Sequence, residues 1–288
     1  MKKLRIILRL KFISYLSLKQ KAQLKYFIAL TAPANIQALF WPSINRRRNS
    51  KELKSVYEQF RPIRINETLV RIGGGNDGGY LIPKISANFD GLISPGVGET
   101  SKFELEFAQG EIRTILIDAS VIKPSNLPEH FLFLPKMVSA TDGLDLISIN
   151  TLVRDYFQHS NNLALQMDIE GGEYEILGNL EKSDLQTFGL ILVEFHFLEK
   201  MRKSEGRKRV LAVLELLGQE FALVHTHPNN AGGFFVDRFI KYPRVLETTW
   251  VRRGLVKATV GKSRLPHPLD EDNEPLIYSL GFPSARGS

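Results

Sequence analysis

The sequence contains no cysteine. The chain therefore has no disulfide scaffold, no thiolate nucleophile and no zinc site built on sulfur. It also lacks an apolar run of about 20 residues, the length that a helix needs to cross a bilayer, because Arg5, Arg9 and Lys11 interrupt its most apolar N-terminal stretch. The same charges exclude the core of a signal peptide. Without repeats or low-complexity tracts, the 288 residues are expected to form one main core with an extension.

Positive charge is concentrated at the N-terminus. Residues 1–60 hold 13 Lys or Arg against two Glu, a net charge of +11, whereas the whole chain carries +7. The rest is slightly acidic and has no basic patch interleaved with aromatics, so no nucleic-acid partner is expected. Two alternatives stay open for the N-terminal stretch: a basic amphipathic segment at the anionic inner face of a membrane, or a helix packed on the domain. We expect a cytoplasmic protein, with peripheral membrane contact in the first case.

The organisation of the chain is that of an α/β domain. From about residue 92, short apolar runs alternate with amphipathic stretches, a pattern typical of a mainly parallel sheet covered by helices on both faces. Strands are predicted at 91–94, 114–118, 131–138, 163–167, 190–193, 221–225 and 245–251, and helices at 101–109, 150–158 (capped by Asn150) and 199–218. No helix separates the last two strands, which predicts an antiparallel hairpin. We expect an extension at 1–60, the domain at 61–261 and a tail at 262–288 that wraps the surface or frays.

A glycine loop follows the first predicted strand. Gly96 and Gly98, followed by Glu99, lie where the backbone can approach a ligand closely. A third glycine of the dinucleotide-binding pattern would fall at Ser101, so an NAD loop loses support. Asp118 ends the next strand 20 residues beyond Gly98, where a carboxylate accepts the hydroxyls of an adenosine ribose. The combination favours an adenosine-containing cofactor over a simple turn.

Charged side chains gather at the ends of two later strands. Asp168, Glu170 and Glu173 follow strand 163–167, and Glu194 and His196 share one face of the next strand because strand side chains alternate with a period of two. Ligands in open α/β sheets bind at the carboxyl ends of the strands. For Glu170 and Glu173, a capping role at the following helix is an alternative. An acid, a second acid and an imidazole are therefore expected to converge.

Other candidates lie elsewhere along the chain. His225 and His227 close a strand and are candidates for substrate binding, although a lone histidine is more often a hydrogen-bonded structural residue. The loop at 73–79 holds five glycines, more than one β-turn requires. Beside it, Asp77 and Tyr80 are candidates for the cofactor or acceptor pocket, and Arg71 is a candidate anchor for an anionic acceptor.

Three segments together resemble the FkbM-type family of S-adenosylmethionine-dependent O-methyltransferases. They are Asp168-Ile-Glu-Gly-Gly-Glu173, Ile191-Leu-Val-Glu-Phe-His196 and Ile149-Asn-Thr-Leu152. The resemblance implies a Rossmann-like class I methyltransferase sandwich, whose seven-stranded, mostly parallel sheet ends in an antiparallel hairpin. It also implies S-adenosylmethionine as cofactor and methyl transfer to a hydroxyl, often on a sugar, glycan or lipid-linked acceptor.

The resemblance assigns roles to the converging residues. His196 or Glu194 would act as the base, and Asp168 would hold the amino group of the cofactor or a divalent cation. Mg or Mn is the candidate metal, with Asp168, Glu194 and His196 as ligands. Two alternatives stay open: a metal-dependent nucleotide-sugar glycosyltransferase, and a non-catalytic domain recruited to a membrane. The oligomeric state is left open by the sequence.

Overall fold

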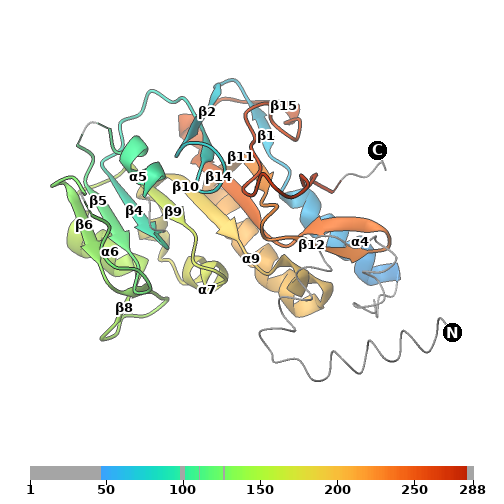
Figure 1. The fold of residues 1–288 in the computed structure, drawn as a ribbon, viewed down its shortest axis with the longest axis horizontal. Coiled ribbons are helices and arrows are strands. Elements are labelled where there is room, and N and C mark those ends of the chain that lie inside the picture. The colour runs from blue at the N-terminus through green and yellow to red at the C-terminus, as the bar shows by residue number, and fades with distance from the viewer. Residues whose placement is uncertain (1–46, 98–100, 110, 126, 284–288) are drawn as a thin grey trace.

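The computed structural model describes residues 47–97, 101–109, 111–125 and 127–283 of the chain. Its centre is a seven-stranded sheet in the order β11-β14-β10-β9-β4-β5-β6 (Figure 1). The strands are β4 (Gly91–Pro95), β5 (Thr114–Ile117), β6 (Phe131–Leu134), β9 (Leu163–Met167), β10 (Phe188–Phe195), β11 (Phe221–Pro228) and β14 (Leu246–Arg252). Only β14 runs antiparallel to its neighbours in this sheet, β10 and β11. The predicted class I methyltransferase sheet is confirmed.

All seven predicted strands are present, and the differences lie at their ends. β10 and β11 run beyond the predicted ends because their last polar residues are buried with polar partners. Predicted strand 131–138 is split after β6, because Pro135 cannot donate to a ladder; β7 (Met137–Val138) then pairs with β8 (Leu146–Ile147). The terminal pair β11–β14 is antiparallel, as predicted, and the ribbon β12 (Phe234–Asp237) and β13 (Ile240–Pro243) is inserted between them.

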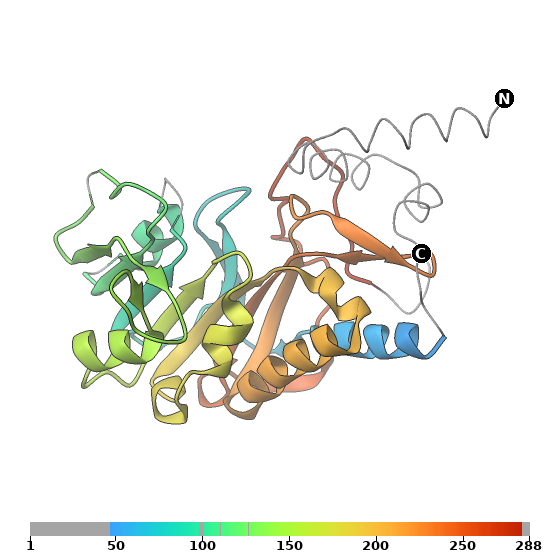
Figure 2. The same cartoon turned by 90° about the horizontal axis from the view of Figure 1, so that it is seen from below.

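Helices cover one face of the sheet. They are α4 (Arg47–Gln59), α6 (Ile149–Tyr156), α7 (Glu173–Gly178), α8 (Lys182–Leu185), the 3₁₀ helix η1 (Leu198–Arg202) and α9 (Ser204–Glu220). Figure 2 shows the blue, yellow-green and orange helices along this one side. α6 is capped by Ser148, whose hydroxyl accepts from the Thr151 amide at 3.1 Å. The predicted cap, Asn150, is wrong by two positions: it lies inside the helix, because the β-region backbone that a cap needs falls at Ser148.

The opposite face is covered by different elements. They are α5 (Lys102–Phe107), the hairpin of β2 (Leu69–Ile72) and β3 (Tyr80–Pro83), and the pair of β1 (Ile63–Ile65) and β15 (Ala258–Lys262), which follows the 3₁₀ helix η2 (Arg253–Leu255). Their apolar side chains pack on β9, β10 and β14 in a second core cluster. Within the described residues, the sheet is therefore covered by five helices and η1 on one face, and mainly by β-structure on the other.

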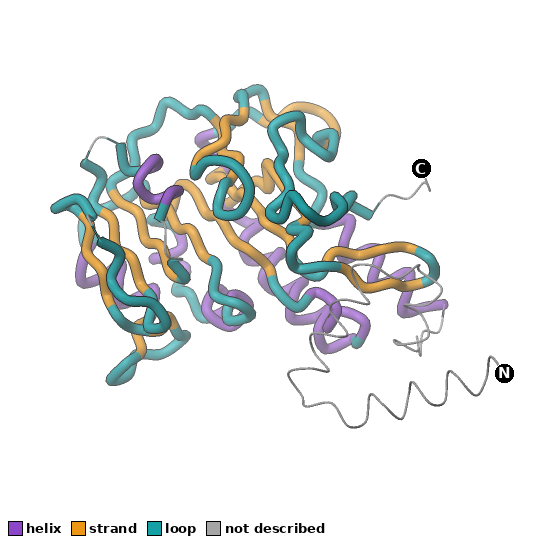
Figure 3. The backbone as a smooth tube through the Cα atoms, viewed as in Figure 1, coloured by secondary structure: helices purple, strands orange, loops and turns teal. Residues whose placement is uncertain are grey.

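The ends of the described chain belong to the folded body. α4 buries Leu53, Val56 and Tyr57 in the main core, upstream of the predicted boundary between extension and domain. Residues 263–283 form a tail without helix or strand, shown as loop in Figure 3, and this tail buries Asn273. The predicted basic amphipathic segment lies outside the described residues. Within the described part of the chain, no helix has the length and apolarity required to cross a bilayer.

Candidate active site

The site begins where the ends of β4 and β9 touch. Gly96 has a φ of +83°, and a Cβ at this position would lie 1.6 Å from the backbone oxygen of Asp168. The Asp168 amide donates to the carbonyl of Pro95 at 3.2 Å. Only glycine combines this left-handed backbone with so close an approach. The two strand ends therefore fix each other and aim Asp168 out of the sheet.

A cavity of about 700 Å³ opens beside this contact. It is lined by Gly96 and Asp118 from the ends of β4 and β5, by residues 119–121 and 136–138, and by Asp168 and Glu170 after β9. One oxygen of Asp118 accepts from the amide and hydroxyl of Ser120, at 2.7 and 2.6 Å. The predicted cofactor residues Gly98 and Glu99 lie outside the described residues. The size and position of the cavity suit a cofactor at the carboxyl ends of the strands.

The three predicted catalytic residues come together, and one of them, Asp168, lines this cavity. His196 Nε2 lies 3.6 Å from an Asp168 oxygen and 3.8 Å from a Glu194 oxygen. One ligand atom from each of these side chains falls within 4.8 Å of the other two. Two oxygens and one nitrogen in this arrangement form a geometrically possible set of ligands for a divalent cation.

Glu173 orients the imidazole. Its carboxylate is fully buried and accepts from the Gly171 amide at 2.9 Å, while His196 Nδ1 lies 2.6 Å away. A carboxylate at that distance fixes the proton on Nδ1, so that Nε2 faces Asp168 and Glu194. From the sequence, Glu173 is one of three carboxylates at the strand end, with a helix cap as the alternative role. The Gly171-Gly172-Glu173 sequence was the available signal for this contact. The two glycines allow a tight turn, and this turn brings Glu173, the first residue of α7, to His196 at the end of β10.

Electrostatics in the trio are unusual. Burial, the charge of Asp168 and the charge of Glu247 raise the pKa of Glu194 well above its ordinary value. Burial also raises the pKa of Asp168, although His196 and a hydrogen bond with Glu194 oppose the shift. The two carboxyls therefore favour a shared proton. Burial acts to lower the pKa of His196, but the hydrogen bond and charge of Glu173, with the charge of Asp168, leave it raised.

A second cavity, of about 380 Å³, is lined by all three residues of the trio. Asp168 and Glu170 line both this cavity and the larger one. Asp77 also lines the smaller cavity, so the structure places it at a candidate acceptor site and not in the larger cavity. Asn229 was missed by the sequence analysis; its amide donates to Glu194 at 2.6 Å. Nothing in its local sequence distinguishes it from a turn residue.

Two residues beside these cavities are strained. Glu170 has a φ of 51° and Phe197 a φ of 55°, a left-handed conformation that costs a non-glycine residue about 1 to 3 kcal/mol. Between them, Gly171 has a φ of +111°, and a Cβ there would lie 2.5 Å from the ring of Phe197. The backbone is thus held in a costly shape where the cavities meet, as is common at functional sites.

Four other candidates, Arg71, Tyr80, His225 and His227, line neither of these two cavities. Arg71 donates to the carbonyls of Gly74 and Asn76, both at 2.7 Å, and so closes its own glycine loop. The buried Tyr80 hydroxyl accepts from Gln166 at 3.2 Å, and Tyr80 lines neither cavity. The roles of these two residues in ligand binding stay predictions.

His225 and His227 bind the tail. His225 Nε2 lies 2.9 Å from one Asp270 oxygen, and His227 Nδ1 lies 3.7 Å from the other. Neither histidine lines the cavities beside the trio. The structure thus gives them a structural contact, the alternative that the sequence left open.

The tail also contacts two buried or cavity-lining acids through Asn273. Asn273 donates to Glu247 at 2.5 Å and to Asp77 at 3.0 Å. Glu247 pairs in register with Glu194 on β10, and burial raises its pKa to about 7. The sequence analysis missed Glu247 and Asn273, because a polar residue in a strand and one in a loop show no sign of meeting.

Comparison with protein families agrees with this geometry. Residues 96–221 match the family model described as the methyltransferase FkbM domain. Among curated proteins, no significant match to the chain is found. The matched range begins at Gly96, the first glycine of the cofactor-sized cavity, and includes Asp118, Asp168, Glu173, Glu194 and His196. The matched residues 96–221 are therefore similar to a methyltransferase domain of the FkbM family.

Proposed function

We propose that the protein is an S-adenosylmethionine-dependent O-methyltransferase that methylates a hydroxyl of a sugar, glycan or glycolipid. One observation supports this most: Asp168 and Glu170 line both the cofactor-sized cavity and the smaller cavity. A ligand in one cavity therefore meets a ligand in the other at the Asp168 carboxylate. Methyl transfer requires such a meeting of donor and acceptor.

The residues of the larger cavity fit the cofactor. Gly96 leaves the backbone open to close approach, and Asp118 stands at the end of β5, where a carboxylate accepts ribose hydroxyls. Asp168 is placed to accept from the cofactor's amino group. When bound, S-adenosylmethionine supplies an electrophilic methyl group on a positively charged sulfur.

His196 is the proposed base. An alcohol is a poor nucleophile near neutral pH, so its proton must pass to a positioned side chain, an effect worth about 100- to 10,000-fold. With Nδ1 held by Glu173, Nε2 accepts the hydroxyl proton as the oxygen forms its bond to the methyl carbon. Bound S-adenosylmethionine would supply the methyl carbon, and the electron pair of its carbon–sulfur bond would remain on the sulfur, which becomes neutral. Asp168 and Glu194 stabilise the imidazolium that results.

A metal-dependent version of the site uses the same trio. Asp168, Glu194 and His196 would present two oxygens and one nitrogen to Mg or Mn. In that version, a bound cation would lower the pKa of the acceptor hydroxyl, the proton would pass to water, and His196 would serve as a ligand and not as the base. Exhaustive chelation distinguishes the metal-dependent version from the version with His196 as the base. Retained activity would rule out the metal-dependent version. Activity that is lost and then restored by Mg or Mn would rule out His196 as the base.

The central test combines cofactor binding with one variant. Calorimetry of the full chain should show binding of S-adenosylmethionine and none of nucleotide sugars, and methyl transfer to a glycan panel should follow. His196→Asn keeps a donor toward Glu173 but removes Nε2, so it should lower kcat by about 100-fold or more with the cofactor affinity unchanged. His159→Asn, at an exposed loop residue, is the matched control. Nucleotide-sugar binding without S-adenosylmethionine binding would support the glycosyltransferase instead.

A further inference from the structure

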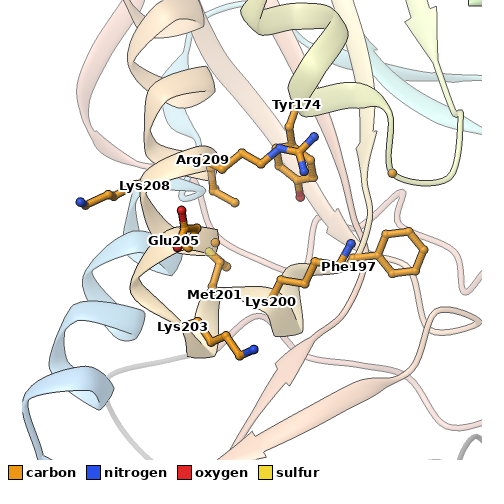
Figure 4. A pocket seen from close by; sticks show the side chains of 11 residues that line it. Tyr174, Phe197, Lys200, Met201, Lys203, Glu205, Lys208 and Arg209 are labelled. Atoms are coloured by element: carbon orange, nitrogen blue, oxygen red, sulfur yellow. The ribbon is translucent and has the colours of Figure 1, made fainter. Parts of the chain in front are cut away.

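A third pocket, which we call the basic pocket, adjoins the site. It has a volume of about 710 Å³ and lies between α7, η1 and the start of α9. Figure 4 shows its labelled side chains, with Arg209 of α9 lying beside the ring of Tyr174 of α7. Lys200, Lys203, Lys208 and Arg209 line the pocket, against a single acid, Glu205. The methyl-transfer mechanism uses none of these residues.

The segment that forms most of the basic pocket is positively charged, whereas the rest of the domain is acidic. Residues 197–210 hold six Lys or Arg against two Glu, a net charge of +4, whereas residues 61–288 as a whole carry −4. One of the six, Arg207, is buried and paired with Glu52 at 2.6 Å. Within the described ranges, the four cations that line the pocket take part in no ion pair. Their charge is therefore available to a ligand.

Two of the cations are held in place by aromatic rings. The Arg209 guanidinium lies 5.4 Å from the centre of the Tyr174 ring, and Lys200 Nζ lies 4.4 Å from the centre of the Phe197 ring. A cation over a ring face gains about 0.5 to 1 kcal/mol at an exposed site. Such contacts restrict long side chains before a ligand arrives, which lowers the entropy lost on binding.

Phe197 joins the basic pocket to the acceptor cavity. Phe197 lines both, and the residue is 37% exposed although it is large and apolar. Gly171 lines the basic pocket, and the preceding Glu170 lines the other two cavities. A ligand whose hydroxyl lies at His196 therefore extends past the Phe197 ring toward Lys200 and Arg209. A sugar ring can pack its apolar face on such an aromatic surface.

We propose that the basic pocket binds an oxyanion group of the methyl acceptor, so that the acceptor is an anionic sugar or glycan bearing phosphate, sulfate or carboxylate. The identification of the ligand as the methyl acceptor rests on the proposed function. The existence of an oxyanion site in the basic pocket does not depend on it. Guanidinium and ammonium groups donate charge-assisted hydrogen bonds to such oxygens. In this arrangement, the Phe197 ring lies between the part of the acceptor that carries the reacting hydroxyl and the part that carries the oxyanion.

The test measures oxyanion binding separately from catalysis. Inorganic phosphate is the probe, and its ³¹P line width is titrated against the full chain at constant ionic strength. The double variant Lys200→Gln/Arg209→Gln should weaken phosphate binding about 10- to 100-fold, as expected for the loss of charged hydrogen bonds. The control is Lys84→Gln/Lys182→Gln, which removes the same charge at exposed positions outside the three pockets.

The outcomes separate the possibilities. Weakening by the basic-pocket pair alone supports the site even if no methyl transfer is found, whereas equal weakening by both pairs, or by neither, overturns it. With an active enzyme, phosphorylated sugars should be preferred over their unphosphorylated forms, and the basic-pocket pair should raise KM for the phosphorylated form and leave kcat nearly unchanged. Exclusive methylation of uncharged acceptors overturns the link to the acceptor. Binding to anionic phospholipid vesicles but not to phosphate or sugar phosphate would replace this proposal with a lipid surface.

Discussion

The contact between Gly96 and Asp168 makes a quantitative prediction. In Gly96→Ala, the new methyl group would lie 1.6 Å from the Asp168 oxygen and 2.5 Å from its carbonyl carbon. Both are backbone atoms, so no side-chain rotation relieves the clash. The ends of β4 and β9 must separate, which breaks the 3.2 Å hydrogen bond from Asp168 to Pro95. The φ of +83° adds the cost of a left-handed conformation.

The expected loss of stability is about 2 to 6 kcal/mol, because backbone strain contributes about 1 to 3 kcal/mol and the clash with its broken hydrogen bond contributes a similar amount. Asp168 moves with its carbonyl, so S-adenosylmethionine affinity should fall at least about 10-fold. Urea unfolding followed by circular dichroism measures the first quantity, and calorimetry measures the second.

Gly218→Ala is the matched control. Gly218 lies inside α9 with no atom within 4 Å of an added Cβ, so this change should stabilise the protein by up to about 1 kcal/mol. If Gly96→Ala matched the wild type in both stability and cofactor affinity, the close strand contact and the location of the cofactor cavity would both be refuted.

Three further predictions concern single side chains. Ser148→Ala removes the cap of α6 and should cost about 1 kcal/mol in urea unfolding; an unchanged midpoint would contradict the cap. Burial acts to raise the pKa of Asp270, but bonds from His225 and its neighbouring histidine hold it below its ordinary value, so this contribution to stability is present above about pH 4 and is lost as pH falls further. Asp270→Asn should lower stability at pH 7 by roughly 1 to 3 kcal/mol and weaken its decline below pH 4, measured by thermal unfolding; an unaltered acid profile would refute this. Glu173→Gln frees the tautomer of His196 and should reduce kcat about 10- to 1,000-fold at unchanged cofactor affinity, and a wild-type kcat would show that Glu173 only caps its helix.

Much of the fold could be predicted from the sequence because burial leaves a local trace. A strand covered on both faces is a continuous apolar run, so β4, β5, β9 and β10 were located from their residues alone. Strand ends were less certain, because polar residues such as Glu194 and His225 look like the start of a loop until their partners are known. Pro135 could have marked the break between β6 and β7, because its missing donor is a local property.

The sequence by itself determined the methyltransferase sheet and the acidic and imidazole residues at its edge. It did so because strand period and strand-end chemistry are properties of neighbouring residues. Only the tertiary structure decided which of those side chains meet. It paired Glu173 with His196, brought Asn273 of the tail onto Glu247, and turned Arg71 toward its own loop. Such contacts depend on how loops return across the sheet, and no local pattern encodes a partner that lies far along the chain.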